Sequence, residues 1–272
     1  MTKHSSDKLR IGAVSYLNTK PLVYQLAQLA PQAVVAFDLP SRLADRLASG
    51  EFDVALIPSI ETLQCDEYAI ISDACIACRG PVWSVRLLSR MPFDQVRTIA
   101  LDEGSRTSVA LTSILFDLQF HRIPKTINLP IDHNPFTVDT DAVLIIGDRA
   151  MSGGSGEFPF DWDLGERWTT ITGLPFVFAM WTARRNLNLN GLELQLALAR
   201  DAGLENLEAI ARAECGRYDL TYEQILIYLR DHLHFRLGPR ECEGLALFRQ
   251  YAVQLGLAPA DVDINFYDCK AT

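Results

Sequence analysis

The stretch Arg10-Ile-Gly-Ala-Val-Ser-Tyr-Leu-Asn-Thr-Lys-Pro-Leu22 joins a short apolar run to a polar turn. The apolar run predicts a β-strand that ends at Ser15. Thr19 is a good N-cap and Pro21 suits a first helical turn, so we expect a helix to begin near Thr19. Free backbone amides at such a helix start can hold an anion, and Asn18 adds a donor and an acceptor. The turn by itself favours a simple helix cap over a ligand site.

The chain up to about residue 60 alternates between strand and helix patterns. Residues 34–39 and 53–57 are apolar runs, and residues 41–50 carry apolar side chains at helical spacing. This β-α-β-α-β order predicts a parallel sheet with right-handed crossovers. Ligands of such sheets bind beyond the carboxyl ends of the strands, where Tyr16 and Ser59 are expected to lie.

A second candidate anion site follows the strand expected at residues 98–101. Small hydroxyl side chains and one arginine converge on the start of the next apolar helix, which runs to residue 120. Hydroxyl groups, a fixed positive charge and free helix amides favour an anionic ligand over a plain helix cap. The spacing is not that of a nucleotide-binding phosphate loop. The residues of this candidate site are Ser105, Arg106, Thr107 and Ser108.

Two further segments offer polar groups where strands end or bend. A strand-like region over residues 68–90 breaks at a Gly-Pro step, and Ser84 follows as a polar residue among apolar ones. On this segment alone, an exposed or back-bonded hydroxyl is the commoner interpretation. The strand expected at residues 142–146 ends at Gly147 and Asp148, which adds another turn at a strand end.

The order of the segments predicts an α/β fold with two lobes around a central ligand cleft. An apolar strand at residues 176–182 is expected to return to the first sheet. One lobe would then comprise residues 1–91 and 177–272, and the other residues 92–176. The chain would cross near residues 89–91 and 174–176, and two crossings form a hinge at which small ligands often bind.

The remaining segments have simpler patterns. Residues 161–168 are expected to form a surface segment. Residues 192–215, 221–235 and 240–255 carry apolar side chains at three- and four-residue spacing, which predicts packing helices.

Composition excludes several classes of partner. The chain has 272 residues and a formal net charge of −9, which argues against a nucleic acid as the partner. A small anion remains compatible, because a pocket can be locally positive in an acidic protein. Apolar runs fall short of the about 20 residues that a bilayer span needs, so no membrane partner is expected. The polar residues 1–8 lack the apolar core of a signal peptide, which predicts a cytoplasmic protein.

The cysteines and histidines do not form a metal-binding pattern. Cys75 and Cys78 form a lone Cys-x-x-Cys in an apolar, strand-like run. Zinc would need further ligands, and a redox pair would stand at a helix start, so buried structural thiols are expected. His232 and His234 would point to different sides of a helix. No metal is therefore expected.

Several segments together resemble the MqnA family of menaquinone biosynthesis, the chorismate dehydratases of the futalosine pathway. The resemblance covers nearly the whole chain in the order of the family, and Ser15-Tyr-Leu-Asn-Thr-Lys-Pro-Leu22 is a fairly specific motif. A sister family that makes dihydroxynaphthoate opens with a Ser-Pro-Cys-Pro-Asn-Asp-Thr type of motif, which is absent here. The other segments that carry the resemblance are residues 53–59, 80–85, 100–108 and 146–149 and the helical tail with Glu243-Gly-Leu245.

The resemblance implies a type II periplasmic-binding-protein-like fold without secretion. It also implies the conversion of chorismate to 3-[(1-carboxyvinyl)oxy]benzoate and water, without a metal or organic cofactor. As catalytic residues it points to Asn18 and Ser84. The expected substrate contacts are Tyr16, Thr19, Ser59, Ser105, Arg106, Thr107, Ser108, Gly147 and Asp148, with the alternative that Arg106 points to solvent.

Two other functions fit the same pattern. The clamp can act as a binding module, either a solute receptor or a ligand sensor, although a signal peptide and a DNA-binding segment are both missing from the sequence. The sister synthase that produces 1,4-dihydroxy-6-naphthoate is disfavoured by the opening motif.

Overall fold

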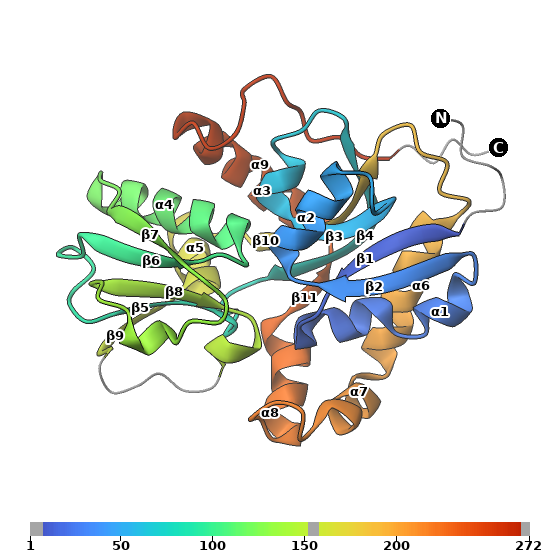
Figure 1. Cartoon of the computed structure of the whole chain (residues 1–272), viewed down its shortest axis with the longest axis horizontal. Helices are drawn as coiled ribbons and strands as arrows, with labels where there is room; N and C mark the ends of the chain where they lie inside the picture. The colour runs from blue at the N-terminus through green and yellow to red at the C-terminus, as the bar shows by residue number, and fades with distance from the viewer. Residues whose placement is uncertain (1–7, 152–157, 268–272) are drawn as a thin grey trace.

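The structure, a computed structural model, describes residues 8–151 and 158–267. Its strands form two sheets that lie side by side (Figure 1). The N-terminal residues 1–7, which contribute to the expectation of a cytoplasmic protein, and Cys269 lie outside the described part.

The first sheet has the strand order β11-β4-β10-β3-β1-β2. As predicted, β1 runs parallel to both β2 and β3, because helical crossovers connect these strands. The predicted return of the chain is also confirmed, since β10 pairs antiparallel with β3 and β4. The strands are β1 (Leu9–Val14), β2 (Ala33–Asp38), β3 (Val54–Pro58), β4 (Tyr68–Cys78), β10 (Phe176–Arg184) and β11 (His234–Arg236).

The second sheet has the strand order β7-β6-β8-β5-β9. Its parallel part is β7-β6-β8, and β5 pairs antiparallel with β8 on one side and β9 on the other. The strands are β5 (Val85–Ser89), β6 (Thr98–Asp102), β7 (Lys125–Leu129), β8 (Ala142–Ile146) and β9 (Phe160–Asp163).

The place of β5 shifts the first crossing between the sheets. Residues 85–89 belong to the second sheet, so the expected crossing at residues 89–91 comes too late. The chain leaves the first sheet after Cys78 and returns before Phe176. We propose two lobes divided at residues 79–84 and 173–175, and call the part with the first sheet the first lobe.

Helices pack against both sheets. The bounds are η1 (Leu17–Val23), α1 (Leu26–Leu29), α2 (Pro40–Ala48), α3 (Ser59–Thr62), α4 (Arg106–Phe120), η2 (Pro135–Thr137), η3 (Asp148–Ala150), α5 (Leu164–Thr172), α6 (Leu192–Glu205), α7 (Leu207–Glu214), α8 (Tyr222–Ile227), η4 (Tyr228–His232) and α9 (Pro239–Gln254).

Three local expectations are wrong. No α-helix is capped by Thr19: a 3₁₀ helix begins at Leu17 and ends before Gln25, whose left-handed φ of 54° separates it from α1. Residues 161–168 are not a surface segment, because they contribute to β9 and α5 and Trp168 is fully buried. The helices expected at 192–215 and 221–235 are interrupted, the first near Asn206 and the second by a π-helical turn, η4, before β11.

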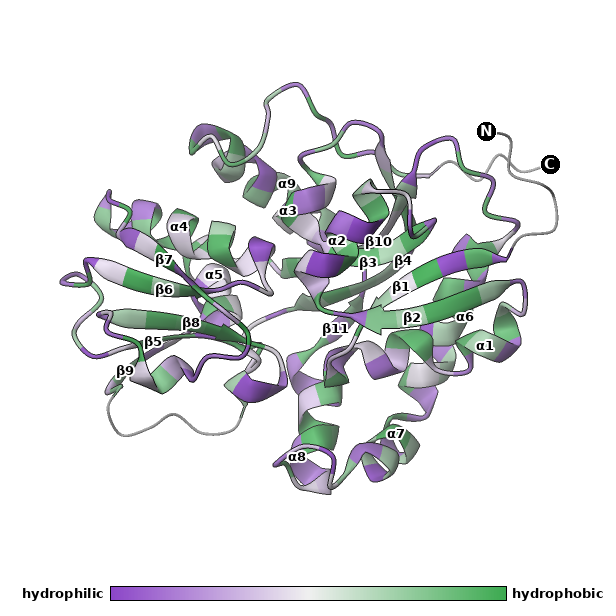
Figure 2. Cartoon of the chain, in the orientation of Figure 1, coloured by the Kyte–Doolittle hydropathy of each residue, from purple (hydrophilic) through white to green (hydrophobic). Residues whose placement is uncertain are grey.

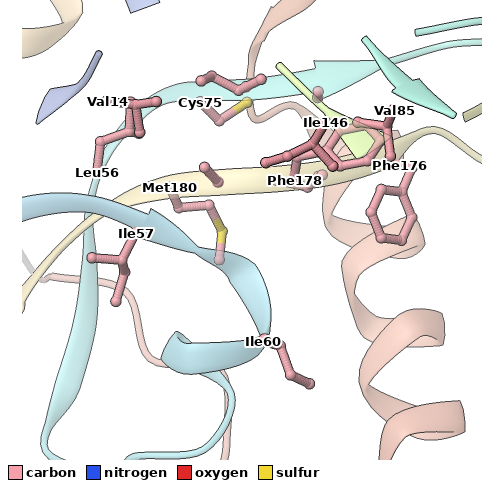
Figure 3. Packing of buried hydrophobic residues seen from close by; sticks show 14 of the residues in the cluster. Val14, Leu56, Ile57, Ile60, Cys75, Val85, Ile146, Phe176, Phe178 and Met180 are labelled. Carbon is pink, nitrogen blue, oxygen red and sulfur yellow. The ribbon is translucent and has the colours of Figure 1, made fainter. Parts of the chain in front are cut away.

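The larger of the two hydrophobic cores among the described residues runs through both lobes. Figure 2 shows mostly hydrophobic strands, whereas the helices alternate hydrophobic with hydrophilic residues. In Figure 3, Val85 and Ile146 of the second sheet lie beside Phe178 of β10, and all three belong to the same buried cluster. Cys75 and Cys78 are buried free thiols on β4, as predicted. Within the described residues, none of the helices combines the length and the apolar character that crossing a membrane requires.

Candidate active site

A pocket lies where the two lobes meet, and the space between its lining atoms, including the part open to solvent, is about 490 Å³. Its walls are largely apolar, and its polar groups are hydroxyls, one amide and backbone. The ends of β1, β3 and β8 and the turns after them supply part of it, as expected for an α/β sheet. The lining residues are Val14, Tyr16, Asn18, Pro40, Pro58, Ile76, Val82, Ser84, Val85, Ser105, Thr107, Ser108, Ile146, Gly147, Phe178 and Ala179.

Tyr16 reaches from the turn after β1 to the second lobe. A Cβ atom built on Gly147 would lie 2.8 Å from the Tyr16 ring, so only glycine allows this close approach. Gly147 also has φ = 69°, which disfavours side chains. The buried Tyr16 hydroxyl has no hydrogen-bond partner among the described residues. Burial raises the Tyr16 pKa, and the nearby Asp102 carboxylate raises it further, so the phenol stays protonated and offers a donor.

Asn18 and Ser84 come from distant parts of the chain and line the same pocket. The hydroxyl of Thr19 donates to Asn18 Oδ1 over 3.3 Å. The fully buried Tyr228 lies beside the turn that carries Ser84, because its ring meets Trp83 edge to face with 5.9 Å between centroids. The turn after β1, the first crossing and η4 therefore come together beside the pocket.

A strained turn presents Ser84 to the pocket. Trp83 has φ = 64°, which is rare for a residue with a side chain. The Asp163 carboxylate holds this turn by accepting the backbone N–H groups of Val82 at 2.9 Å and Trp83 at 2.5 Å. Burial raises the Asp163 pKa, and these hydrogen bonds oppose the shift. The strain at Trp83 is thus offset by contacts that fix the position of Ser84.

The start of α4 supplies three hydroxyls to the pocket. Ser105 caps the helix, since its Oγ accepts the backbone N–H of Ser108 at 3.3 Å, and it donates to Ser108 Oγ at 2.7 Å. Thr107 Oγ1 accepts the backbone N–H of Ile60 at 3.2 Å, across the two lobes. The hydroxyl hydrogens of Thr107 and Ser108 are therefore free of these bonds and available to a ligand.

Two more contacts close the lobes on each other. Asp148 Oδ1 accepts the backbone N–H of Leu17 at 3.0 Å. The amides at this helix start were predicted to be free for an anion, and the Asp148 carboxylate occupies one of them instead. Arg106 does not line the pocket: its guanidinium pairs with Asp45 at 2.7 Å and Glu61 at 3.1 Å, both in the first lobe. The sequence allowed either contact with the substrate or exposure to solvent; the Arg106 side chain is 37% exposed and is held in this ion pair between the lobes.

A family described by its role in menaquinone biosynthesis has a sequence profile that matches residues 9–254. The chain belongs to this menaquinone biosynthesis family. A chorismate dehydratase of Thermus thermophilus is 30% identical over 270 residues, an alignment that covers 91% of this chain and 95% of the relative. The family resemblance noted from the sequence motifs is thereby confirmed.

Solved structures show how this member of the menaquinone biosynthesis family folds. A protein of Archaeoglobus fulgidus has a TM-score of 0.75 at 17% identity, covering 93% of this chain and 100% of that one. The alkanesulfonate-binding protein SsuA of Xanthomonas axonopodis has a TM-score of 0.64 at 14% identity, covering 94% and 96%. A Candida albicans protein with the generic periplasmic-binding-protein fold has a TM-score of 0.61 at 11% identity, covering 94% and 92%. The predicted periplasmic-binding-protein-like fold is confirmed.

The structure brings together most of the residues singled out from the sequence. Tyr16, Asn18, Ser84, Ser105, Thr107, Ser108 and Gly147 all line the pocket. Thr19 and Asp148 do not line the pocket: Thr19 is bonded to the lining residue Asn18, and Asp148 follows the lining residue Gly147 and is bonded to Leu17. Ser59 is turned to the core, where its hydroxyl donates to the Val177 carbonyl at 2.8 Å.

The sequence analysis did not place Tyr228 near the site. Its helical surroundings predicted only packing, and no motif marks it as a neighbour of the turn at Trp83. Within the described ranges, no group of three His, Cys, Asp or Glu side chains gathers as a metal site.

Proposed function

We propose that this protein is a lyase that converts chorismate to 3-[(1-carboxyvinyl)oxy]benzoate and water. The observation that carries the proposal is that Asn18 and Ser84, from different parts of the chain, line one pocket in a member of a menaquinone biosynthesis family. The Thermus thermophilus relative named chorismate dehydratase supports this choice of reaction.

The chemistry of the pocket suits a small ring with polar substituents. Val14, Ile76 and Phe178 supply apolar contact for a planar diene. Thr107 and Ser108 offer hydroxyl donors at the N-terminus of α4, where backbone amides add positive potential for a carboxylate. Neutral donors of this kind hold an anion without a side-chain cation in the lining.

The reaction needs little chemistry from side chains. A proton leaves the ring carbon that bears the enolpyruvyl ether, the hydroxyl leaves the neighbouring carbon, and a double bond forms between the two carbons. The ring becomes aromatic, and the proton combines with the departing hydroxyl as water. The pocket lining is apolar or uncharged, so we assign proton abstraction to the side-chain carboxylate of the substrate itself. Asn18 orients that carboxylate through its amide.

The test is to incubate the purified protein with chorismate, with and without a chelator, and to follow the products by chromatography and mass spectrometry. We expect a product lighter by one water in both samples. Unchanged chorismate together with a higher Tm in its presence would indicate a binding module instead. Unchanged chorismate without a shift in Tm would redirect the assay to the sister synthase reaction.

Asn18→Ala tests the residue assignment. Loss of one positioned donor lowers kcat by about 100-fold when that donor acts on the reacting groups. The matched control is Asn128→Ala, because Asn128 is exposed on β7 away from the pocket. An Asn18→Ala variant that folds and turns over like the wild type would contradict the role of Asn18.

A further inference from the structure

Asp102 is a fully buried carboxylate at the end of β6 that does not itself line the pocket. The Gly104 N–H donates to its Oδ1 over 2.9 Å, and the Ile146 N–H donates to its Oδ2 over 3.2 Å. The Arg149 guanidinium also pairs with Oδ2. A buried charge needs such partners, and here they come from three segments: the turn after β6, the end of β8, and η3.

Two of these segments carry residues of the pocket lining. Gly104 is followed by Ser105, which lines the pocket and caps α4, and the Ser105 N–H donates to the Asp102 backbone carbonyl over 3.2 Å. Ile146 and the next residue, Gly147, line the pocket from the end of β8. One carboxylate therefore fixes the start of α4 relative to the end of β8.

The Tyr16 side chain from the first lobe packs against both segments. A Cβ atom built on Gly104 would lie 3.1 Å from Asp102 Oδ1 and 3.4 Å from the Tyr16 hydroxyl oxygen, so the turn at Gly104 fits between these two groups. A Cβ atom on Gly147 would lie 2.8 Å from the Tyr16 ring. The segments that Asp102 holds thus form the wall of the second lobe against which the first lobe closes.

We propose that Asp102 is a positioning residue that holds the start of α4 where Thr107 and Ser108 meet a carboxylate of the substrate. The inference rests on the proposed dehydration and specifies how the second lobe binds the anionic substrate. Arg149 balances the charge of Asp102, so a buried carboxylate can hold this wall without repelling an anion.

Asparagine has nearly the shape of aspartate but accepts hydrogen bonds on one side only. Ile146 N–H and the Arg149 guanidinium both donate to Oδ2 of Asp102, whereas only Gly104 N–H, among the described donors, reaches Oδ1. The amide oxygen in Asp102→Asn is therefore expected to face the two donors, which turns its NH₂ group toward the Gly104 N–H. Two donors then face each other, and the turn that leads into α4 shifts.

The experiment measures kcat and KM of Asp102→Asn in the chorismate assay. We expect KM to rise by about 10-fold, because the displaced hydroxyls of α4 lose a bond to the substrate carboxylate, and kcat to stay within about 3-fold of the wild type. An unchanged KM, or a loss confined to kcat, would overturn the inference. No product from the wild type would overturn the dehydratase proposal and this inference with it.

Asp141 provides the matched control at the other end of the same strands. Its Oδ2 accepts the backbone N–H groups of Arg97 at 2.8 Å and Thr98 at 2.9 Å, where β6 begins. Asp141→Ala removes both bonds from the second lobe at a place away from the pocket lining, so we expect a lower Tm with the KM of the wild type. Equal rises of KM in Asp141→Ala and Asp102→Asn would indicate a general loosening of the lobe and overturn the inference.

Gly104→Ala tests the same bond with the carboxylate in place, and so does not depend on the folding of Asp102→Asn. Its Cβ would lie 3.1 Å from Asp102 Oδ1, so the turn and the carboxylate must move apart. A Tyr16→Phe background lacks the hydroxyl that the same Cβ approaches, which isolates the effect on Asp102. We expect Gly104→Ala to raise KM in this background as well. A KM that it leaves unchanged there would contradict the positioning role.

Discussion

The Asp148 carboxylate accepts the backbone N–H of Leu17 across the two lobes, with 3.0 Å between Asp148 Oδ1 and Leu17 N. This bond joins the turn after β8 to the turn after β1, on either side of the pocket. Burial, with a smaller contribution from Glu214, raises the pKa of Asp148 to about 6, although the Leu17 hydrogen bond and Lys20 oppose the shift. The contact between the lobes is therefore sensitive to pH.

Asp148→Asn removes this pH dependence. The folded-state pKa of about 6 lies above the ordinary 3.8, so the folded protein binds the extra proton between these values. The stabilisation from that proton is present below pH 4 and is lost as the pH rises through 6. After a reduction for the partial exposure of the Asp148 carboxylate, the loss of unfolding free energy is about 2 kcal/mol. Because an asparagine side chain keeps an acceptor without a charge, we expect the variant to gain stability over the wild type as the pH rises.

Urea unfolding at pH 4.5 and pH 7.5 checks this expectation, with exposed Asp261→Asn as the matched control. The difference in unfolding free energy between Asp148→Asn and the wild type should be larger at pH 7.5. A difference that is the same at both pH values would show that Asp148 is not the titrating group.

We expect Arg106 to help hold the two lobes closed on each other. Its ion pairs reach Asp45 and Glu61 of the first lobe, and its side chain does not line the pocket. Such half-exposed pairs are weak, so Arg106→Ala should raise KM by only about 3-fold and leave kcat unchanged. Asp45→Ala should also raise KM, and both effects should shrink at high salt.

The partner variant decides between closure and direct contact. If Arg106 bound the substrate carboxylate directly, removal of Asp45 would not weaken binding. Arg212→Ala, which breaks an exposed ion pair on α7, provides the control for loss of a surface arginine. A raised KM in Arg106→Ala without one in Asp45→Ala would reject the closure interpretation.

Gly147→Ala tests the contact with Tyr16. The positive φ of 69° strains an alanine there, and its Cβ would lie 2.8 Å from the Tyr16 ring. Gly173 has a similar φ of 71° with open space around its would-be Cβ, so Gly173→Ala isolates the backbone cost. We expect a loss of about 1 kcal/mol in Gly173→Ala and at least about 2 kcal/mol in Gly147→Ala. Equal losses in urea unfolding would mean that the Tyr16 ring moves aside freely.

Patterns along the chain predicted the elements whose neighbours are close in sequence. The strands β1, β2 and β3 and the helix α2 were predicted because apolar runs alternate with helical spacing over a short stretch. The strand β9 was not predicted, because its two aspartates make the segment Phe160-Asp-Trp-Asp163 polar. Its Trp162 ring stacks on Phe93, with 3.9 Å between the ring centroids. That partner is distant in sequence, so no local pattern marks it.

The residues of the candidate site also fall into two groups, those that local sequence patterns mark and those that depend on contacts distant in sequence. Tyr16 stands at a strand end and Ser105 at a helix start, where ligands of such sheets bind, and both line the pocket. For Asn18 the turn alone favoured a simple helix cap, and the family resemblance pointed to the site. The environments of Arg106 and Tyr228 depend on how the lobes and the C-terminal helices pack. Asp45 next to Arg106 and Trp83 next to Tyr228 are tertiary contacts that periodicity cannot predict.

Ser59 and Ser108 form a final matched pair of buried hydroxyls. Ser59→Ala leaves the Val177 carbonyl without its donor, which costs about 1 to 2 kcal/mol of stability, and it should leave KM within about 2-fold of the wild type. Ser108 lines the pocket with its hydrogen free of the bond from Ser105, so Ser108→Ala should raise KM by about 10-fold through loss of a bond to a carboxylate. Thermal unfolding and steady-state kinetics on both variants measure the two effects. A raised KM in Ser59→Ala at unchanged Tm would instead place its hydroxyl on the substrate.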